Sequence, residues 1–179
     1  MIGKIVSPYI KKHLLGTYLK QNRTVKLQTF ENSKSVGILW NPSDETSIET
    51  FEQLRKVLKD KGIKAIGIAF IDSKSEKETL TTIAHSGFIH KNEVSFWGKV
   101  NSAEALQFID QPFDILIDLT IKKVFALQYV LVHSAAKFKV GWKAYGPNFY
   151  DLDVDVTSKP ECRYLLEQII HYLDTFKEK

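Results

Sequence analysis

Cysteine, long apolar runs and glycine-rich loops are scarce or missing in this sequence, and each shortage excludes a class of protein. Cys162 is the single cysteine among 179 residues, so the chain can form neither an internal disulfide nor a cysteine-based zinc site. This cysteine usage predicts a reducing, cytoplasmic location. No uncharged run approaches the roughly 18 residues that span a bilayer. The apolar start of the chain is interrupted by lysines and a proline, unlike a signal peptide.

Phosphate-binding and metal-binding motifs are also missing. A dinucleotide-binding turn needs glycines directly after the first strand, so that the backbone can approach the pyrophosphate. The turn here reads WNPSD at residues 40–44. Gly62 and Gly67 have the spacing of P-loop glycines, but Ile68 and Ala69 follow where lysine and a hydroxyl residue are needed. Because the histidines form no paired ligand motif either, we predict no metal site and no cofactor.

The overall composition is that of an ordinary globular domain. Hydrophobic residues make up 44% of the chain and charged residues 26%, which argues against intrinsic disorder of the whole chain. A chain of 179 residues suits one domain that buries about 70% of its unfolded surface. We expect a single α/β domain at residues 33–179, preceded by a basic helical arm and connector at residues 1–32.

The net charge of +4 is concentrated in this N-terminal arm. Residues 1–30 carry a charge of +6, so the other 149 residues sum to −2. Residues 8–20 have the pattern of a basic amphipathic helix. Its lysine face suits an anionic surface, either RNA or membrane headgroups. The alternative is that its apolar face docks on the protein's own domain and the lysines only keep the other face solvated. The candidate residues for the anionic surface are Lys4, Lys11, Lys12, Lys20 and Arg23.

Short apolar runs alternate with helical patterns through the rest of the chain. We predict strands at residues 35–40, 65–71, 87–90, 94–97, 113–118, 138–141 and 152–156, and helices at residues 46–61, 76–85, 103–110, 124–132 and 162–176. This alternation favours a Rossmann-like, doubly wound, mostly parallel sheet of about five or six strands with flanking helices, plus the basic N-terminal helix. The alternating acids of residues 152–156 are typical of an edge strand.

Capping patterns mark the expected ends of two helices. Thr46 with Glu49, and Ser158 with Glu161, have the spacing of a capping box. Gly62 stands where a helix commonly ends in a left-handed residue. Both boxes predict that a hydroxyl side chain accepts a hydrogen bond from the first helical turn.

We infer the candidate ligand site from the residues that stand at the ends of the predicted strands. In open α/β sheets, ligands bind beyond the carboxyl ends of the strands, where the strand order reverses. Asp118 ends the most apolar strand, and it is either a turn-forming acid or a crevice acid that binds a hydroxyl or a metal-bound phosphate. The crevice candidates are Trp40, Asn41, Asp72, Asp118, Thr120 and Trp142.

Two further features have both a functional and a structural interpretation. Asp151, Asp153 and Asp155 alternate along one strand, so they either bind a divalent cation or form the solvated face of an edge strand. We favour the edge strand. Cys162 lies on the apolar stripe of the last helix, which predicts a buried, unreactive thiol.

Three segments carry a resemblance that extends over nearly the whole chain. They read SKSVGIL at residues 33–39, PFDILIDL at residues 112–119 and AKFKVG at residues 136–141. With these segments the chain resembles a small bacterial family of α/β proteins, one of the domains of unknown function. The resemblance implies a fold and leaves the activity open.

A second, local resemblance involves about 30 residues. FDILIDL at residues 113–119, followed by SAAKFKVGW at residues 134–142, is similar to the N-terminal half of heptosyltransferase-type glycosyltransferases. Those enzymes bind their nucleotide sugar mainly through a second Rossmann-like half, for which this chain has no room. The resemblance therefore implies a half-domain without the donor site.

The sequence favours a cytoplasmic, non-catalytic binding or interaction module. Its basic N-terminal helix would contact a protein partner or an anionic surface. The alternative is a small enzyme, or a protein that binds a nucleotide or sugar nucleotide, with a crevice at the strand ends.

Overall fold

The computed structural model describes residues 12–13, 16–20, 23–72, 80, 83–95 and 99–176. Within these ranges the strands are β1 (Ser35–Trp40), β2 (Lys64–Ile71), β3 (Ser86–His90), β4 (Ile115–Asp118), β5 (Phe138–Gly141) and β6 (Leu152–Asp153). The helices are α2 (Ser47–Asp60), α4 (Ala103–Ile109), α5 (Phe125–His133) and α6 (Cys162–Thr175), with a 3-10 turn η1 (Lys91–Glu93). Residues 12–13 and 16–20 are also helical.

The strands form one sheet in the order β3-β2-β1-β4-β5-β6, and every neighbouring pair is parallel. The chain leaves β1 toward β2 and later leaves β4 toward β5, so the strand order reverses between β1 and β4. This arrangement confirms the predicted doubly wound sheet. It also confirms β6 at an edge, although β6 has only two residues.

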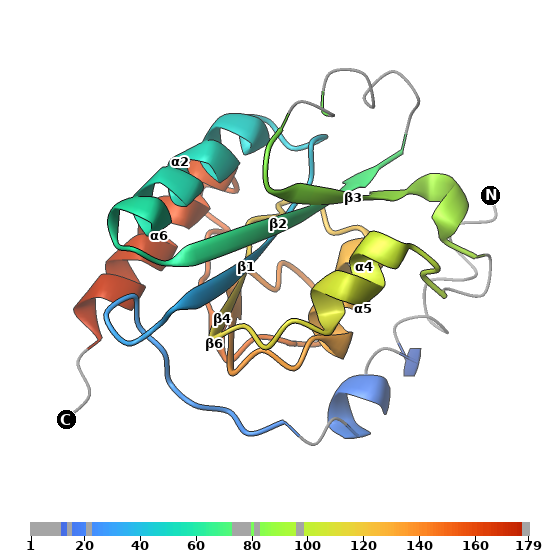
Figure 1. Ribbon diagram of the computed structural model, residues 1–179, viewed down its shortest axis with the longest axis horizontal. Coiled ribbons are helices and arrows are strands. Elements are labelled where there is room, and N and C mark those ends of the chain that lie inside the picture. Colours follow the sequence, from blue (N-terminus) through green and yellow to red (C-terminus); the bar gives the residue numbers. More distant parts are fainter. Residues whose placement is uncertain are drawn as a thin grey trace.

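Helices cover both faces of the sheet (Figure 1). Ile38 of β1 packs in one core with Phe51 of α2 and Leu165 of α6. Its neighbour Leu39 points to the opposite face and packs in a second core with Phe108 of α4 and Leu127 of α5, among others. Successive side chains of a strand point to opposite faces, so a buried strand such as β1 must be apolar at nearly every position.

Two predicted helix caps are wrong. Thr46 does precede α2, but its φ is 59° and its side chain caps no backbone N–H. A capping side chain needs extended backbone geometry, which a left-handed residue lacks. Helix α6 begins one residue after Glu161, which is itself the N-cap, so Ser158 lies too far from the first turn. Gly62 follows the end of α2 with φ of 72°, as predicted.

The described part of the arm docks on the domain. Tyr18 packs edge-on against Phe149, with 5.3 Å between the ring centroids. Further along, the backbone N–H of Lys26 donates to the carbonyl of Lys137, and Phe30 is buried in the core. The remainder of the predicted helix 8–20 lies outside the described residues. No helix in the described ranges combines the length and the apolar composition that a membrane crossing requires.

Candidate functional site

The two loops at the topological switch point lie side by side. Leu39 of β1 is the register partner of Asp118 of β4, and the N–H of Leu119 donates to the carbonyl of Leu39. Residues 41–46 follow β1 and residues 119–124 follow β4, so both loops leave the carboxyl edge of the sheet at neighbouring positions. In a doubly wound fold, this is where a ligand crevice is expected.

The Asp44 carboxylate connects these loops directly. Its two oxygens accept hydrogen bonds from the backbone N–H groups of Ile121 and Lys122, at 2.8 and 3.0 Å. Burial raises the pKa of the Asp44 carboxyl, and the two amide bonds act in the opposite direction. Two adjacent amides before a helix are a common binding place for an anion. Here the chain's own carboxylate occupies that place.

Asp118 is buried and surrounded by hydrogen-bond donors. One of its oxygens accepts from the backbone N–H and the hydroxyl of Thr120, at 2.8 and 2.6 Å. The other oxygen accepts from Lys123 Nζ at 3.2 Å and from the Tyr150 hydroxyl at 2.5 Å. The side chains of Lys123 and Asp118 are only 1% and 2% exposed. The carboxylate is thus both paired and hydrogen-bonded, as a buried charge must be.

Tyr150 reaches Asp118 because Gly141 has no side chain. A Cβ at position 141 would lie 2.6 Å from Tyr150 Cε1 and 3.0 Å from Asp118 Cβ. Burial raises the pKa of Tyr150 well above its ordinary value, and the charge of Asp118 adds to this effect. The phenol therefore stays protonated and donates to the carboxylate.

A small cavity of about 330 Å³ opens beside Asp44. It is lined by Asp44, Glu45, Thr46, Ile121, Lys122, Pro160, Glu161 and Cys162. Carboxylates outnumber the single lysine in this lining, which is unfavourable for a phosphate. Burial raises the pKa of the Cys162 thiol to about 12, with further contributions from Asp44 and Asp118. A thiol with that pKa is a poor nucleophile at neutral pH.

The structure brings some of the predicted crevice residues together and places others elsewhere. Asn41 lies beside Asp118 and Thr120 in the switch-point loops, where its amide donates to the carbonyl of Lys122 at 3.2 Å. Trp40 is fully buried and stacks on Phe51 in the core. Asp72 pairs with Lys91 on the surface at 2.6 Å, and Trp142 packs against the α2–α6 core.

The three alternating aspartates bind different groups. Asp151 pairs with Arg23, Asp153 accepts from the N–H of Lys143, and Asp155 accepts from the N–H and hydroxyl of Thr157. Within the described ranges, no three histidine, cysteine, aspartate or glutamate side chains form a group that could hold a metal ion. The expected solvated face is wrong for Asp151, whose side chain is only 9% exposed.

The anionic-surface candidates of the arm have different environments. Lys12 and Lys20 are exposed, and they line a shallow hollow of about 350 Å³ with His13, Gly16 and Thr17. Arg23 is instead buried against Asp151 and donates to the carbonyls of Ala136 and Lys137. Lys4 and Lys11 lie outside the described residues.

Sequence reasoning missed Asp44, Lys123 and Tyr150 at this site. Lys123 follows Asp118 by five residues, and Asp44 ends the turn after β1, so both positions carried a local signal. Tyr150 lies 32 residues after Asp118, and no local pattern connects them. Sequence reasoning also missed the cationic groove between α2 and the start of β3, described below.

The strand order, the helices on both faces and the joined carboxyl-edge loops define a Rossmann-like, doubly wound α/β protein. The chain belongs to a family of unknown function, DUF6913, whose model matches residues 4–176. Comparisons with curated proteins and with solved structures gave no match. The match to a family of unknown function confirms the first resemblance seen in the sequence, and no glycosyltransferase match supports the second.

Proposed function

We propose that this protein is a cytoplasmic, non-catalytic binding module that contacts an anionic macromolecular partner through its N-terminal arm. One observation carries the proposal: the Asp44 carboxylate sits on the two backbone amides that would otherwise hold a ligand's anionic group at the switch point. A phosphate in that position would have to displace an internal carboxylate and then face the remaining acids of the cavity.

The buried acid Asp118 also supports a structural role for the strand ends. A catalytic acid or base must reach the proton that it transfers. Asp118 is 1% exposed, and its oxygens already accept from Thr120, Lys123 and Tyr150. Its contacts fix the β4–α5 loop and leave no oxygen directed at a substrate.

The arm presents its cationic side because the opposite side is docked. Tyr18, on the apolar side of the predicted helix, packs against Phe149, so the described helix at residues 16–20 turns this side toward the domain. Lys12 and Lys20 are exposed, and Leu19, which precedes Lys20 in the chain, is 73% exposed. Lysines held in this way suit a negatively charged surface, whose phosphates they would neutralise.

The test uses charge reversal in place of truncation, because residues 23–30 include buried contacts of the fold. The full-length protein and its Lys12→Glu/Lys20→Glu variant are compared by gel shift with single-stranded RNA and by co-sedimentation with phosphatidylserine vesicles. We expect the unmodified protein to bind one of these probes. We expect the variant to bind it about tenfold more weakly or worse, with a smaller salt dependence.

A matched control is the Lys99→Glu/Lys143→Glu variant, which makes the same change of charge at two exposed positions elsewhere. The control should bind like the unmodified protein. If neither probe binds, or if both double variants lose binding equally, the arm is not the contact surface and the proposal is wrong.

A second candidate function, binding of a nucleotide or sugar nucleotide at the strand ends, has one observation in its favour. Ser47 begins α2 directly after Thr46, which lines the 330 Å³ cavity, and the buried Ser47 hydroxyl has no hydrogen-bond partner among the described residues. A thermal-shift screen with nucleotides, sugar nucleotides and Mg²⁺ tests it, since a saturating ligand stabilises by a few kcal/mol. A shift that Ser47→Ala and Asp44→Asn both abolish would favour this candidate over the first.

A further inference from the structure

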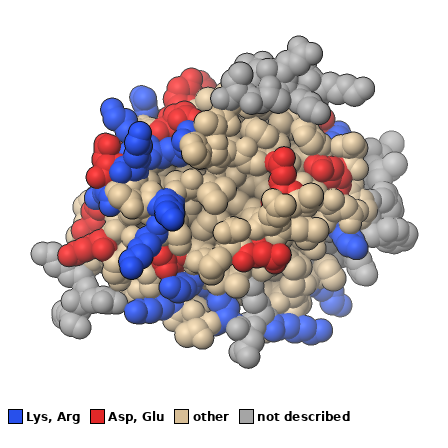
Figure 2. Space-filling model, viewed as in Figure 1, with Lys and Arg blue, Asp and Glu red and all other residues tan. Residues whose placement is uncertain are grey.

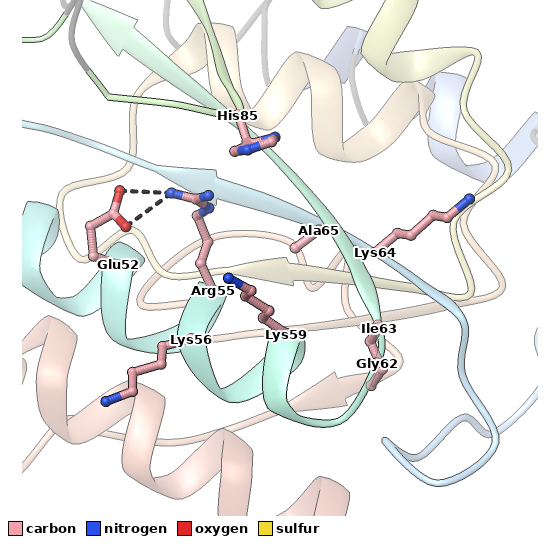
Figure 3. Close-up of a pocket in the computed structure, with 9 residues that line it drawn as sticks. All are labelled: Glu52, Arg55, Lys56, Lys59, Gly62, Ile63, Lys64, Ala65 and His85. Carbon is pink, nitrogen blue, oxygen red and sulfur yellow. Dashed lines mark hydrogen bonds and ion pairs between the residues drawn. The ribbon is translucent and has the colours of Figure 1, made fainter.

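A cationic groove lies between α2 and the strands β2 and β3, away from the switch point (Figure 3). It has a volume of about 580 Å³ and is lined by Glu52, Arg55, Lys56, Lys59, Gly62, Ile63, Lys64, Ala65 and His85. Arg55 and Lys59 point from α2 toward His85, whereas Lys56 and Lys64 extend to either side. Over the α2 side of the molecule, Lys and Arg side chains lie with Asp and Glu side chains among them (Figure 2).

The positive charge of the groove is only partly compensated. Glu52 is the one carboxylate in the lining, and it pairs with Arg55 at 2.9 Å. Glu52 is 47% exposed, so this pair contributes little to stability and can open at small cost. Arg55 and Lys59 are four residues apart on α2, a spacing at which like charges repel. An anion between them would remove that repulsion.

His85 provides an independent indication that the groove has a function. Its φ is 62°, a left-handed conformation that is costly for a residue with a side chain. Its carbonyl accepts the N–H of Gly67, which fixes the residue at the point where β3 begins to pair with β2. Glycine would adopt this conformation without strain. The histidine therefore keeps its ring at the groove at a conformational cost.

The lining chemistry narrows the ligand class. The guanidinium and the three ammonium groups of the lining match phosphate oxygens, which accept charge-assisted hydrogen bonds. The lining contains no Phe, Tyr or Trp, so it offers no surface on which a base could stack, as single-stranded nucleic acid binding usually requires. The groove is also short, because α2 ends at Asp60. A compact oligophosphate fits these features better than a long polymer.

We propose that the groove formed by Arg55, Lys59 and His85, with Lys56 and Lys64 at its rim, is a binding site for the oligophosphate group of a small molecule. The phosphates would lie between α2 and the start of β3. Arg55 would exchange its exposed partner Glu52 for phosphate oxygens. This site is separate from the arm and from the switch-point loops, so it does not depend on the function proposed above.

Isothermal titration of the full-length protein with sodium tripolyphosphate at low ionic strength tests the proposal. We expect saturable binding by the unmodified protein, and binding about tenfold weaker or worse in Arg55→Gln/Lys59→Gln. The matched control Lys99→Gln/Lys143→Gln removes the same charge elsewhere on the surface and should bind normally. The arm variant Lys12→Glu/Lys20→Glu should also bind normally, which keeps this test independent of the arm.

His85→Gly provides a second test that loss of folding cannot mimic. The substitution relieves the left-handed strain, so we expect an unchanged or higher melting temperature together with weaker tripolyphosphate binding. Melting temperatures of all variants are measured in parallel. Absence of binding at millimolar tripolyphosphate, equal weakening in the lysine control, or normal binding by both groove variants would each overturn the proposal. Tighter, groove-dependent binding of single-stranded RNA would overturn its assignment to a small molecule.

Discussion

Arg23 and Asp151 form a buried, two-bond ion pair that fastens the N-terminal arm to the residue preceding β6. Arg23 Nη1 and Nη2 lie 2.8 and 2.7 Å from the two carboxylate oxygens, although the residues are 128 positions apart. Their side chains are 6% and 9% exposed. One oxygen of Asp151 also accepts the N–H of Lys139 at 2.8 Å. The pair thus joins the arm, β5 and the start of β6.

Breaking this pair should destabilise the fold and release the arm. In Asp151→Asn the guanidinium of Arg23 stays buried without its counter-charge, so we expect the free energy of unfolding to fall by about 3 kcal/mol. Trypsin cleavage after Lys20 and Arg23 should become faster. Urea denaturation and limited proteolysis measure the two effects. The control Asp155→Asn changes an exposed aspartate of the same series and should behave like the unmodified protein.

The pair of Asp118 with Lys123 predicts a large, partly reversible loss of stability. Asp118→Asn leaves the buried ammonium of Lys123 without its counter-charge, so we expect a loss of about 3–5 kcal/mol. Adding Lys123→Met should recover part of this loss, since both charges are then gone. Guanidinium denaturation of the two single variants and the double variant gives the coupling energy. Additive losses would show that the two side chains do not interact.

Lys139 predicts that stability rises with pH above neutrality. This fully buried lysine lies beneath Tyr18, and its pKa is lowered from 10.5 to about 7 by burial, with Arg23 adding to the effect and Asp151 opposing it. Between these two values the unfolded chain binds the proton and the folded protein releases it, so raising the pH favours the folded state. Below pH 7 the charged form is present in both states, and the cost of burying it is complete.

Comparison with Lys139→Met isolates this effect from other titrating groups. From pH 7 to pH 9 the free energy of unfolding of the unmodified protein should rise by about 2 kcal/mol relative to the variant. Chemical denaturation at several pH values measures the difference. Parallel pH profiles for the two proteins would show that Lys139 keeps its ordinary pKa.

Gly141→Ala tests the close packing of Tyr150 over β5. The new methyl group would meet the Tyr150 ring and the Asp118 side chain at 2.6 and 3.0 Å, and neither can move without disturbing the buried hydrogen bonds. We expect a loss of about 1–3 kcal/mol. Gly16→Ala is the control, because a Cβ at this helical position has no neighbour within 4 Å and alanine favours helix. Equal stability of the two variants would contradict the packing argument.

Cys162 should react with thiol reagents only when the protein unfolds. The side chain is 1% exposed, and its pKa is raised to about 12 by burial and by nearby acids. In native buffer, labelling of Cys162 by a disulfide reagent should be slow. In denaturant, the labelling rate should approach that of a free thiol. Rapid labelling of the native protein would show that the start of α6 opens into solvent.

The periodicity of the sequence was sufficient to predict most of the described elements and the class of the fold. Of the strand predicted at residues 94–97, however, residues 94–95 belong to no strand, and residues 96–97, like most of the predicted helix 76–85, lie outside the described residues. The predicted strand at residues 113–118 contains β4, which is shorter at Ile115–Asp118, and the stripe that begins at Cys162 follows α6 to within one residue of its end. These patterns are local, because the side chains that face one core recur within a few residues of one another. Capping was predicted less well. Thr46 is left-handed, and two residues before it Asp44 contacts a loop 77 residues later; no helix-start pattern contains either feature.

The candidate site was predictable in position but not in chemistry. Parallel strands place their carboxyl ends at one edge, so Asn41, Asp118 and Thr120 were expected to lie close together. Whether that edge is open depends on which distant side chains reach it, and here Asp44 and Tyr150 do so.

By itself, then, the sequence determined the alternating strands and helices, the buried centre of the sheet and the basic character of the arm. Only the tertiary structure decided that Arg23 is bound to Asp151, that Asp118 is enclosed by Lys123 and Tyr150, and that Arg55 and Lys59 face His85 across a groove. The reason is physical. Local patterns determine which face of an element is apolar, whereas the meeting of residues far apart in the chain depends on strand order and on the packing of the whole core.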